Sequence, residues 1–132
     1  MSEQDNKQVV QQVFESFGRG DIPGLLKSLS EDVVWSAPGS ADVPYHGERR
    51  GHSGATEFFQ QLGSNVSFES FEPGAFIAEG DRVVVLGRER GRVNATGKVF
   101  DNEWALVFTL SGGKITDFKL YENTAAVVEA FR

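Results

Sequence analysis

The stretch from residue 82 to residue 123, RVVVLGRERGRVNATGKVFDNEWALVFTLSGGKITDFKLYEN, decides the fold of this chain. It holds three extended segments, Arg82–Val93, Lys98–Leu110 and Lys114–Asn123, separated by short polar turns. The glycine pair Gly112–Gly113 between the last two segments is typical of a two-residue hairpin turn. The stretch therefore predicts a three-stranded antiparallel meander.

Counting residues back from the glycine pair places a row of charged side chains across this meander. Glu103 then lies opposite Glu122, and a four-residue loop at 94–97 sets Arg88 opposite Glu103. Because side chains alternate across a strand, these three residues share one face with a set of apolar residues, Val84, Leu86, Ala105, Val107, Phe118 and Leu120. A cation and two carboxylates at the open end of an apolar face predict a small-molecule site.

Glu103, Glu122 and Arg88 are accordingly the candidate catalytic residues. Two carboxylates one strand apart repel each other, so one of them should hold its proton more tightly, and the pair could supply one acid and one base. Arg88 would hold the ionised partner through a bidentate hydrogen bond. The alternative is a cross-strand ion-pair network at the solvated rim of the sheet, which contributes little to stability.

The other face of the meander carries Trp104, Phe108 and Tyr121. If helices cover the first face, this aromatic face is exposed, and an exposed apolar surface indicates a protein partner. We therefore expect a homodimer through the face bearing these three residues. If the two faces are exchanged, the aromatic cluster becomes the core and the charged row lies outside.

The rest of the chain predicts helices that cover one side of the sheet. Val9, Val10, Val13, Phe14 and Phe17 recur at helical spacing, and Asp21 can cap a second helix. The remaining expected elements are a strand at Asp32–Ala37, a loop at Pro38–Gly51, a helix from about Ser53, an extended run at Val66–Ala78 and a last helix at Thr124–Phe131. This order predicts one α+β domain over residues 1–132, with a curved antiparallel sheet forming a cone around about three helices.

Composition narrows the classes of partner. The 132 residues are 39% hydrophobic and carry a net charge of −6, which argues against nucleic acids and anionic membranes. The chain has no cysteine, so neither a disulfide nor a thiol nucleophile is available. Residues 2–8 are polar and no apolar run reaches membrane length, so we expect a cytoplasmic protein.

Four motifs carry a resemblance to a known family. They are FESFGRGD (14–21), LLKSLSEDVVW (25–35), GHSGATEFFQQL (51–62) and ATGKVFDNEWALVFTLSGGKITDFKLYENTA (95–125). Together they resemble the nuclear transport factor 2-like superfamily, in its SnoaL-like polyketide cyclase and ketosteroid isomerase-related branch. The resemblance implies the cone fold, chemistry without a cofactor, and dimers formed through the sheet. It does not choose among the isomerases, cyclases, hydrolases and non-catalytic binding proteins of that superfamily.

The catalytic groups of the best-known relatives are missing at the matching positions. Where ketosteroid isomerases have an Asp base before a proline, an oxyanion-hole Tyr and a protonated Asp, this sequence has Ala37, Val13 and Ala105. Where cyclases and limonene epoxide hydrolases have an Asp on the last strand, it has Leu120. Steroid isomerisation by the usual groups is therefore not expected.

The resemblance implies that Trp35 and Phe59 point into a cavity, and Phe118, Leu120 and the loop residue His46 complete the expected ligand-binding set. His46 and His52, six residues apart without a third ligand, do not predict a metal site, and no cofactor is expected. Two functional classes stay open. One is an acid/base enzyme acting on a small hydrophobic metabolite, of isomerase, cyclase or hydrolase type; the other is a non-catalytic ligand-binding or degenerate homodimeric module.

Overall fold

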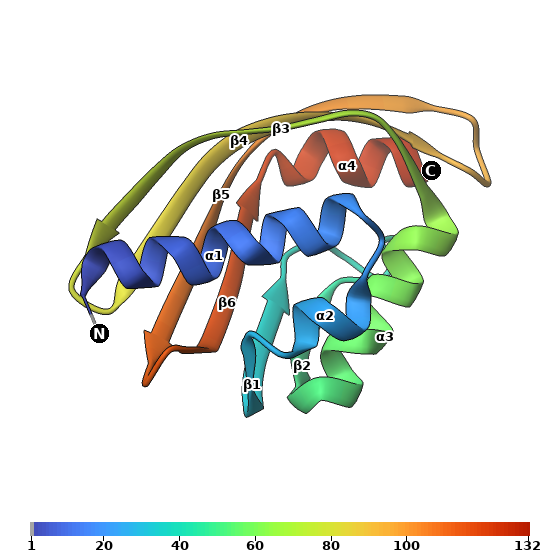
Figure 1. Cartoon of the computed structure of the whole chain (residues 1–132). Coiled ribbons are helices and arrows are strands. Elements are labelled where there is room, and N and C mark those ends of the chain that lie inside the picture. The colour runs from blue at the N-terminus through green and yellow to red at the C-terminus, as the bar shows by residue number, and fades with distance from the viewer. Residues whose placement is uncertain (1) are drawn as a thin grey trace.

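A six-stranded curved sheet in the order β2-β1-β6-β5-β4-β3 frames the molecule, and β3, β4 and β5 arch over the first helix (Figure 1). The computed structural model describes residues 2–132. Its elements are α1 (Glu3–Gly18), α2 (Ile22–Leu26), β1 (Leu29–Ala37), β2 (Gly47–Arg50), α3 (Gly51–Asn65), β3 (Val66–Glu79), β4 (Arg82–Val93), β5 (Val99–Ser111), β6 (Lys114–Glu122) and α4 (Thr124–Phe131). The expected α+β cone is confirmed.

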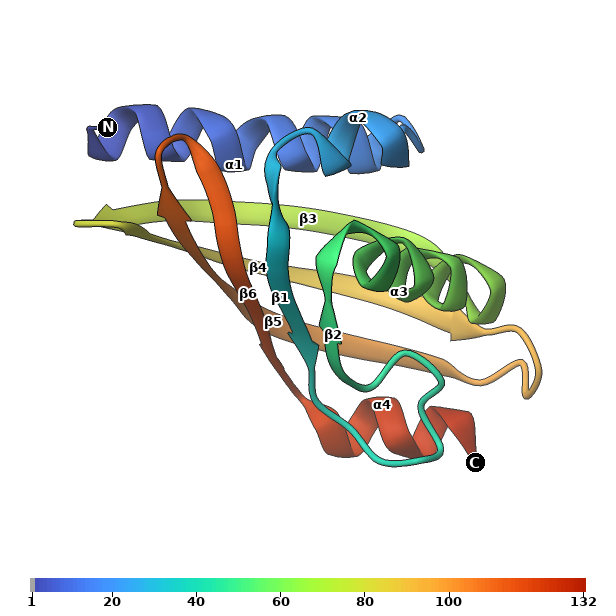
Figure 2. The ribbon, with the colours of Figure 1, turned by 90° about the horizontal axis from the view of Figure 1, so that it is seen from below.

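The helices lie on the concave side of this sheet, and α1 and α4 are seen beneath the arch in Figure 1. Figure 2 shows α1 and α2 along one side of the molecule, α4 along the opposite side, and α3 beside β2. The first helices begin where short polar side chains can cap them: Ser2 Oγ accepts from the amide of Asp5 at 3.0 Å, and Asp21 Oδ1 accepts from the amide of Gly24 at 2.9 Å. The predicted Asp21 cap is thus confirmed.

Two features of the sheet differ from the sequence-based expectation. The loop predicted at Pro38–Gly51 contains the short strand β2, antiparallel to β1. Its four residues, Gly-Glu-Arg-Arg, show no apolar alternation, so no periodic signal marks it. The sheet is also mixed, because β1 pairs with β6 in parallel.

The register of β5 against β6 changes by one residue close to the hairpin turn. Ser111 pairs with Lys114 and Leu110 with Ile115, as counting from the glycine pair requires, but Thr109 pairs with Asp117. Thr116 is the extra residue, and its hydroxyl donates to the Thr109 carbonyl at 3.3 Å. Such a bulge moves every later pair by one, so Glu122 lies opposite Trp104 and not opposite Glu103.

The consequence is that the two faces of β4 and β5 are exchanged relative to the expectation. Trp104 and Phe108 are 5% and 1% exposed and belong to the core, whereas Tyr121 is 50% exposed on the outer face. A dimer contact containing Trp104 and Phe108 is therefore excluded by their burial. The large aromatic side chains take the covered face because burying them removes the most apolar surface from water.

Candidate functional site

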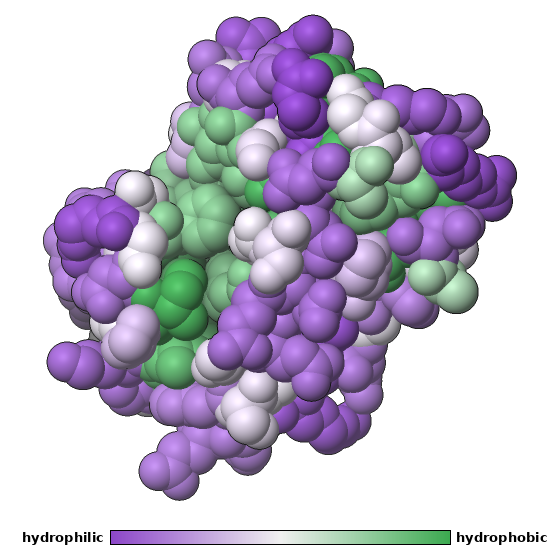
Figure 3. Space-filling view, turned by 90° about the vertical axis from the view of Figure 1, so that its right-hand side faces the viewer, coloured by the Kyte–Doolittle hydropathy of each residue, from purple (hydrophilic) through white to green (hydrophobic). Residues whose placement is uncertain are grey.

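An apolar cavity of about 80 Å³ lies between the helices and the covered face of the sheet. Its walls are mostly aromatic, with Phe14 and Phe17 from α1, Phe58 and Phe59 from α3, and Phe68 and Phe71 from β3. Viewed from the side on which α3 lies in Figure 1, hydrophobic side chains are visible in a hollow between polar ones (Figure 3). A cavity of this size suits a small ligand with one or two rings.

Two carboxylates line this cavity and share one amide group. Asn102 on β5 donates through Nδ2 to Glu122 Oε1 at 2.9 Å and to Glu89 Oε2 at 3.2 Å. Asn102 Oδ1 accepts from the backbone N–H of Asn123 at 2.9 Å, so the NH₂ group must face the carboxylates. Asn102 is 3% exposed and forms hydrogen bonds through both its amide nitrogen and its amide oxygen, which makes it a rigid bridge between the two acids.

Burial makes both acids weaker. Burial, the larger cause, and the neighbouring charge of Glu122 together raise the pKa of Glu89 from 4.5 to about 7, against the opposing hydrogen bond from Asn102. Burial likewise raises the pKa of Glu122, against the hydrogen bond from Asn102. Glu122 Oε2 is buried without a hydrogen-bond partner in the described chain. One of the two groups can therefore hold a proton near neutral pH while the other is ionised.

Two further polar groups lie at the same end of the cavity. Burial and the charges of Glu122 and Glu89 raise the pKa of Tyr45 far above its ordinary value, so its phenol stays protonated. The indole N–H of Trp104 lies close enough to the Glu89 carboxylate to lower its pKa. It does not form a hydrogen bond with that carboxylate, and Nε1 has no partner among the described residues. Both groups are donors available to a bound oxygen or to an ionised carboxylate.

The loop that carries Tyr45 is fixed by one arginine. Arg49 donates to the carbonyls of Tyr45, His46 and Pro44 at 3.0, 3.1 and 3.3 Å, and its Nε pairs with Glu57 at 3.0 Å. The Arg49 side chain is only 13% exposed. Tyr45 also packs its ring edge-on against Phe131 of α4, so the loop is held from both sides.

Comparison with known proteins identifies the family of the chain. The SnoaL-like domain family matches residues 10–118. The chain belongs to the SnoaL-like domain family. Its fold is that of nuclear transport factor 2-like proteins, which hold small ligands and are often dimeric.

Three solved structures cover nearly the whole of this SnoaL-like chain. It is 37% identical to an NTF2-like protein from Burkholderia xenovorans, with a TM-score of 0.92 and coverage of 100% of this chain and 99% of that one. An NTF2-like protein from Burkholderia pseudomallei is 27% identical, with a TM-score of 0.86 and coverage of 99% and 98%. TerC, co-crystallised with polyporic acid, is 26% identical, with a TM-score of 0.85 and coverage of 96% and 98%. No curated protein matches the chain.

The candidate residues named from sequence fall into two groups in this SnoaL-like domain. Trp35, Phe59, Phe118, Leu120 and Glu122 line the cavity.

Arg88 and Glu103 lie opposite each other, as predicted, but on the outer face of the sheet, so the row with Glu122 does not form. Arg88 pairs instead with Glu72 at 2.6 Å. His46 does not line the cavity, and its Nδ1 lies 2.6 Å from the Val43 carbonyl. Ala105, named from sequence as a match to an isomerase Asp, sits on the outer face next to Glu103.

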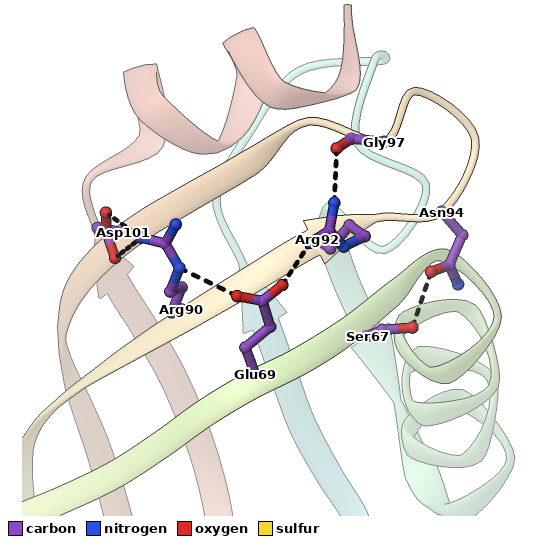
Figure 4. A network of polar contacts seen from close by, with 7 residues as sticks. All are labelled: Ser67, Glu69, Arg90, Arg92, Asn94, Gly97 and Asp101. Carbon is purple, nitrogen blue, oxygen red and sulfur yellow. Dashed lines mark hydrogen bonds and ion pairs between the residues drawn. The ribbon is translucent and has the colours of Figure 1, made fainter.

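The outer face carries an ion-pair network. Figure 4 shows Arg90 and Arg92 both reaching Glu69, with Arg90 also bound to Asp101. These side chains are largely exposed, and exposed pairs of this kind contribute little to stability.

Sequence reasoning missed Glu89, Asn102, Tyr45 and Trp104 as site residues. A signal was present in Gly87-Arg88-Glu89-Arg90-Gly91, because small residues on one face leave room for large side chains on the next strand. A Cβ at Gly87 would clash with the Trp104 ring, and one at Gly91 would clash with the ring of Phe100. Glu89, between the two glycines on that face, must therefore point into the same space.

Two further classes of site are not found in the described part of the chain. Residues 2–132 contain no group of three or more His, Cys, Asp or Glu side chains placed to hold a metal ion. No helix among them is long and apolar enough to cross a membrane.

Proposed function

We propose that this SnoaL-like protein binds a small, mostly apolar metabolite in the cavity and catalyses a proton transfer on it without a cofactor. The observation that carries the proposal is the pair Glu89–Glu122, bridged by Asn102 at the polar end of an aromatic cavity. An ionised carboxylate is a base and its protonated neighbour an acid, and both work best when their pKa lies near the working pH. Tyr45 donates a hydrogen bond to the oxygen on which charge develops.

The mostly aromatic walls of the cavity favour a flat, cyclic ligand. The stacked rings of Trp35 and Phe118, 3.9 Å apart, and of Phe71 and Trp104, 5.3 Å apart, offer flat apolar walls for such a molecule. The reaction class that suits these groups is proton abstraction next to a carbonyl, followed by reprotonation elsewhere on the ring.

Deuterium exchange tests this function directly. The probe is 2-tetralone, an enolisable bicyclic ketone, incubated in D₂O with the protein, and the readout is incorporation of deuterium at C1 by NMR. We expect exchange that follows a pH profile set by the carboxylate pair and that falls at least about 100-fold in Glu89→Gln. Glu103→Gln removes the same charge from the outer face and should leave the rate unchanged.

The second candidate function is ligand binding without chemistry. The observation that favours it is Ala37 on the cavity strand β1, with Leu120 on β6, where relatives of the resembled branch carry acids. Under this alternative, 2-tetralone binds, Glu89→Gln binds it equally well, and neither protein exchanges its protons faster than buffer.

We further propose that the protein is a homodimer through the outer face of the sheet, which keeps Tyr121 from the residues named from sequence but not the buried Trp104 and Phe108. Leu86, Ala105 and Tyr121 lie in one row there, and Ile77 and Val84 form part of the next row. Leu86, Ile77 and Tyr121 are 43%, 51% and 50% exposed. Light scattering should give twice the chain mass for the natural protein and a single chain mass for Leu86→Glu; a monomeric natural protein would contradict the proposal.

A further inference from the structure

We propose that the cavity selects a small organic cation, an amine carried on one apolar ring. This inference rests on the proposed function, since it names the ligand class of the same cavity. It follows from the charges of the lining, from its aromatic walls and from the hydrogen-bond donors beside its two acids.

The charges of the cavity lining are all of one sign. Glu89 and Glu122 are its ionisable acids, and no lysine or arginine is among the residues that line it. The two arginines next to Glu89 on β4 point to the outer face, where Arg88 pairs with Glu72 and Arg90 with Glu69 and Asp101. An anionic ligand would meet buried like charge without a counter-ion, whereas a cation would supply the charge that the pair lacks.

The groups around the two acids favour their ionised forms once a cation is present. Asn102 donates to both carboxylates, and the indole N–H of Trp104, which has no partner among the described residues, lowers the pKa of Glu89. Trp104 is buried, so this N–H cannot donate a hydrogen bond to water. Ionisation of Glu89 would pair it with a charged acceptor, which strengthens the hydrogen bond.

The walls suit a cation as well as an apolar ring. Phe14 and Phe71 both stack near the face of Trp104, with ring centroids 6.2 and 5.3 Å away. The faces of aromatic rings carry partial negative charge and attract cations, most strongly where water is excluded. A ring with one ammonium group would thus have its apolar body against the aromatic wall and its charge near the carboxylates.

Cation binding makes a directional prediction for pH. The titratable groups facing Glu89 are Glu122 from β6 and Tyr45 from the loop before β2, while α1, α3 and β3 present only apolar side chains to the cavity. Tyr45 stays neutral, because burial raises its pKa far above the ordinary value. A cation stabilises ionised Glu89 and lowers its pKa in the complex, so affinity must rise as pH increases through about 7, the value for the free protein.

The test compares two isosteric probes, phenyltrimethylammonium and tert-butylbenzene. The first carries a permanent charge, so any pH dependence belongs to the protein, and the second has the same shape without the charge. Binding is followed at pH 5.5 and pH 8 by the fluorescence of Trp35 and Trp104. We expect the cation to bind at least about tenfold more tightly at pH 8 than at pH 5.5, while the neutral probe changes little.

Variants separate the ligand class from the function of the cavity. Glu89→Gln and Glu122→Gln should each weaken the cation and reduce its pH dependence, and Glu103→Gln on the outer face should do neither. The proposal is overturned if the neutral probe binds as tightly as the cation at pH 8, or if neither probe binds. Tight binding of the neutral probe alone would contradict an amine as the ligand. It would not contradict the cavity or its proposed proton-transfer function.

Discussion

Glu89 on β4 and Glu122 on β6 face each other across β5, although their strands are not paired with each other. The link between them is the amide of Asn102, which donates to both from the intervening strand. The arrangement depends on the bulge at Thr116, because without it Glu122 would point to the outer face. A single extra residue near the hairpin turn therefore completes the acid pair.

The stability of the protein should fall as pH rises from about 4.5 to about 7. Glu89 ionises near 4.5 in the unfolded chain and near 7 in the folded one, so the folded state binds more protons throughout this interval. A shift of this size corresponds to about 3 kcal/mol of unfolding free energy lost across the interval, with little further change above it. Urea unfolding at pH 5 and pH 8 measures the difference.

Glu89→Gln should remove most of this slope and make the protein more stable at pH 8 than the natural chain. The amide is neutral at every pH, so position 89 no longer adds a buried charge to that of Glu122. Glu103→Gln, exposed on the same sheet, should leave the slope in place. A natural protein whose stability does not change between pH 5 and pH 8 would show that Glu89 is not buried as described.

Replacing the bridge should destabilise the protein in a pH-dependent way. Asn102→Leu keeps the shape and removes the donors to both acids and the acceptor for the Asn123 amide. We expect a loss of about 1–3 kcal/mol at pH 8 and a smaller loss at pH 5, where protonated carboxyls depend less on a donor. Equal losses at the two pH values would mean that Asn102 acts only through Asn123.

Close packing at Gly87 gives a prediction that involves no charge. A methyl group there would clash with the indole of Trp104, so Gly87→Ala should destabilise the protein by about 1–3 kcal/mol and alter its tryptophan fluorescence. Gly63→Ala, in α3 with open space around it, should instead stabilise the protein by about 0.5–1 kcal/mol. The same sign for both substitutions would contradict the packing described here.

The loop that carries Tyr45 should become more mobile when the guanidinium group of Arg49 is replaced. Arg49→Lys keeps the charge but cannot reach three carbonyls and Glu57 together, so amide hydrogen exchange over residues 43–47 should accelerate. Arg50→Lys is the matched control, because Arg50 is exposed and pairs only with the neighbouring Glu48. Identical exchange in the two variants would show that the loop is held from the α4 side alone.

Much of the fold follows from local signals in the sequence. The boundaries of β4 and α4 and the pairing of Arg88 with Glu103 agree with the expectation, because turns and alternation fix them. The short strand β2 gives no such signal, since its pairing comes from a neighbouring strand and not from its own pattern.

The candidate site was harder to predict because it depends on the faces of the strands. The bulge at Thr116 leaves no mark in composition, and a shift of one residue exchanges inside and outside. The sizes of the side chains could have resolved this, because Trp104 and Phe108 on one face of β5 outweigh Glu103 and Ala105 on the other. Glu122, a candidate from sequence, lines the cavity, but the acid linked to it through Asn102 is Glu89 on β4 and not Glu103 on β5.

The proton shared by Glu89 and Glu122 can be observed by a carboxyl titration by NMR, with ¹³C in the side chains of all glutamates. We expect one carboxyl that titrates near pH 7, disappears in Glu89→Gln, and titrates at lower pH in Glu122→Gln because a repelling charge is gone. Glutamates that all titrate near their ordinary value of 4.5, with no change between the two variants, would contradict a buried, proton-sharing pair.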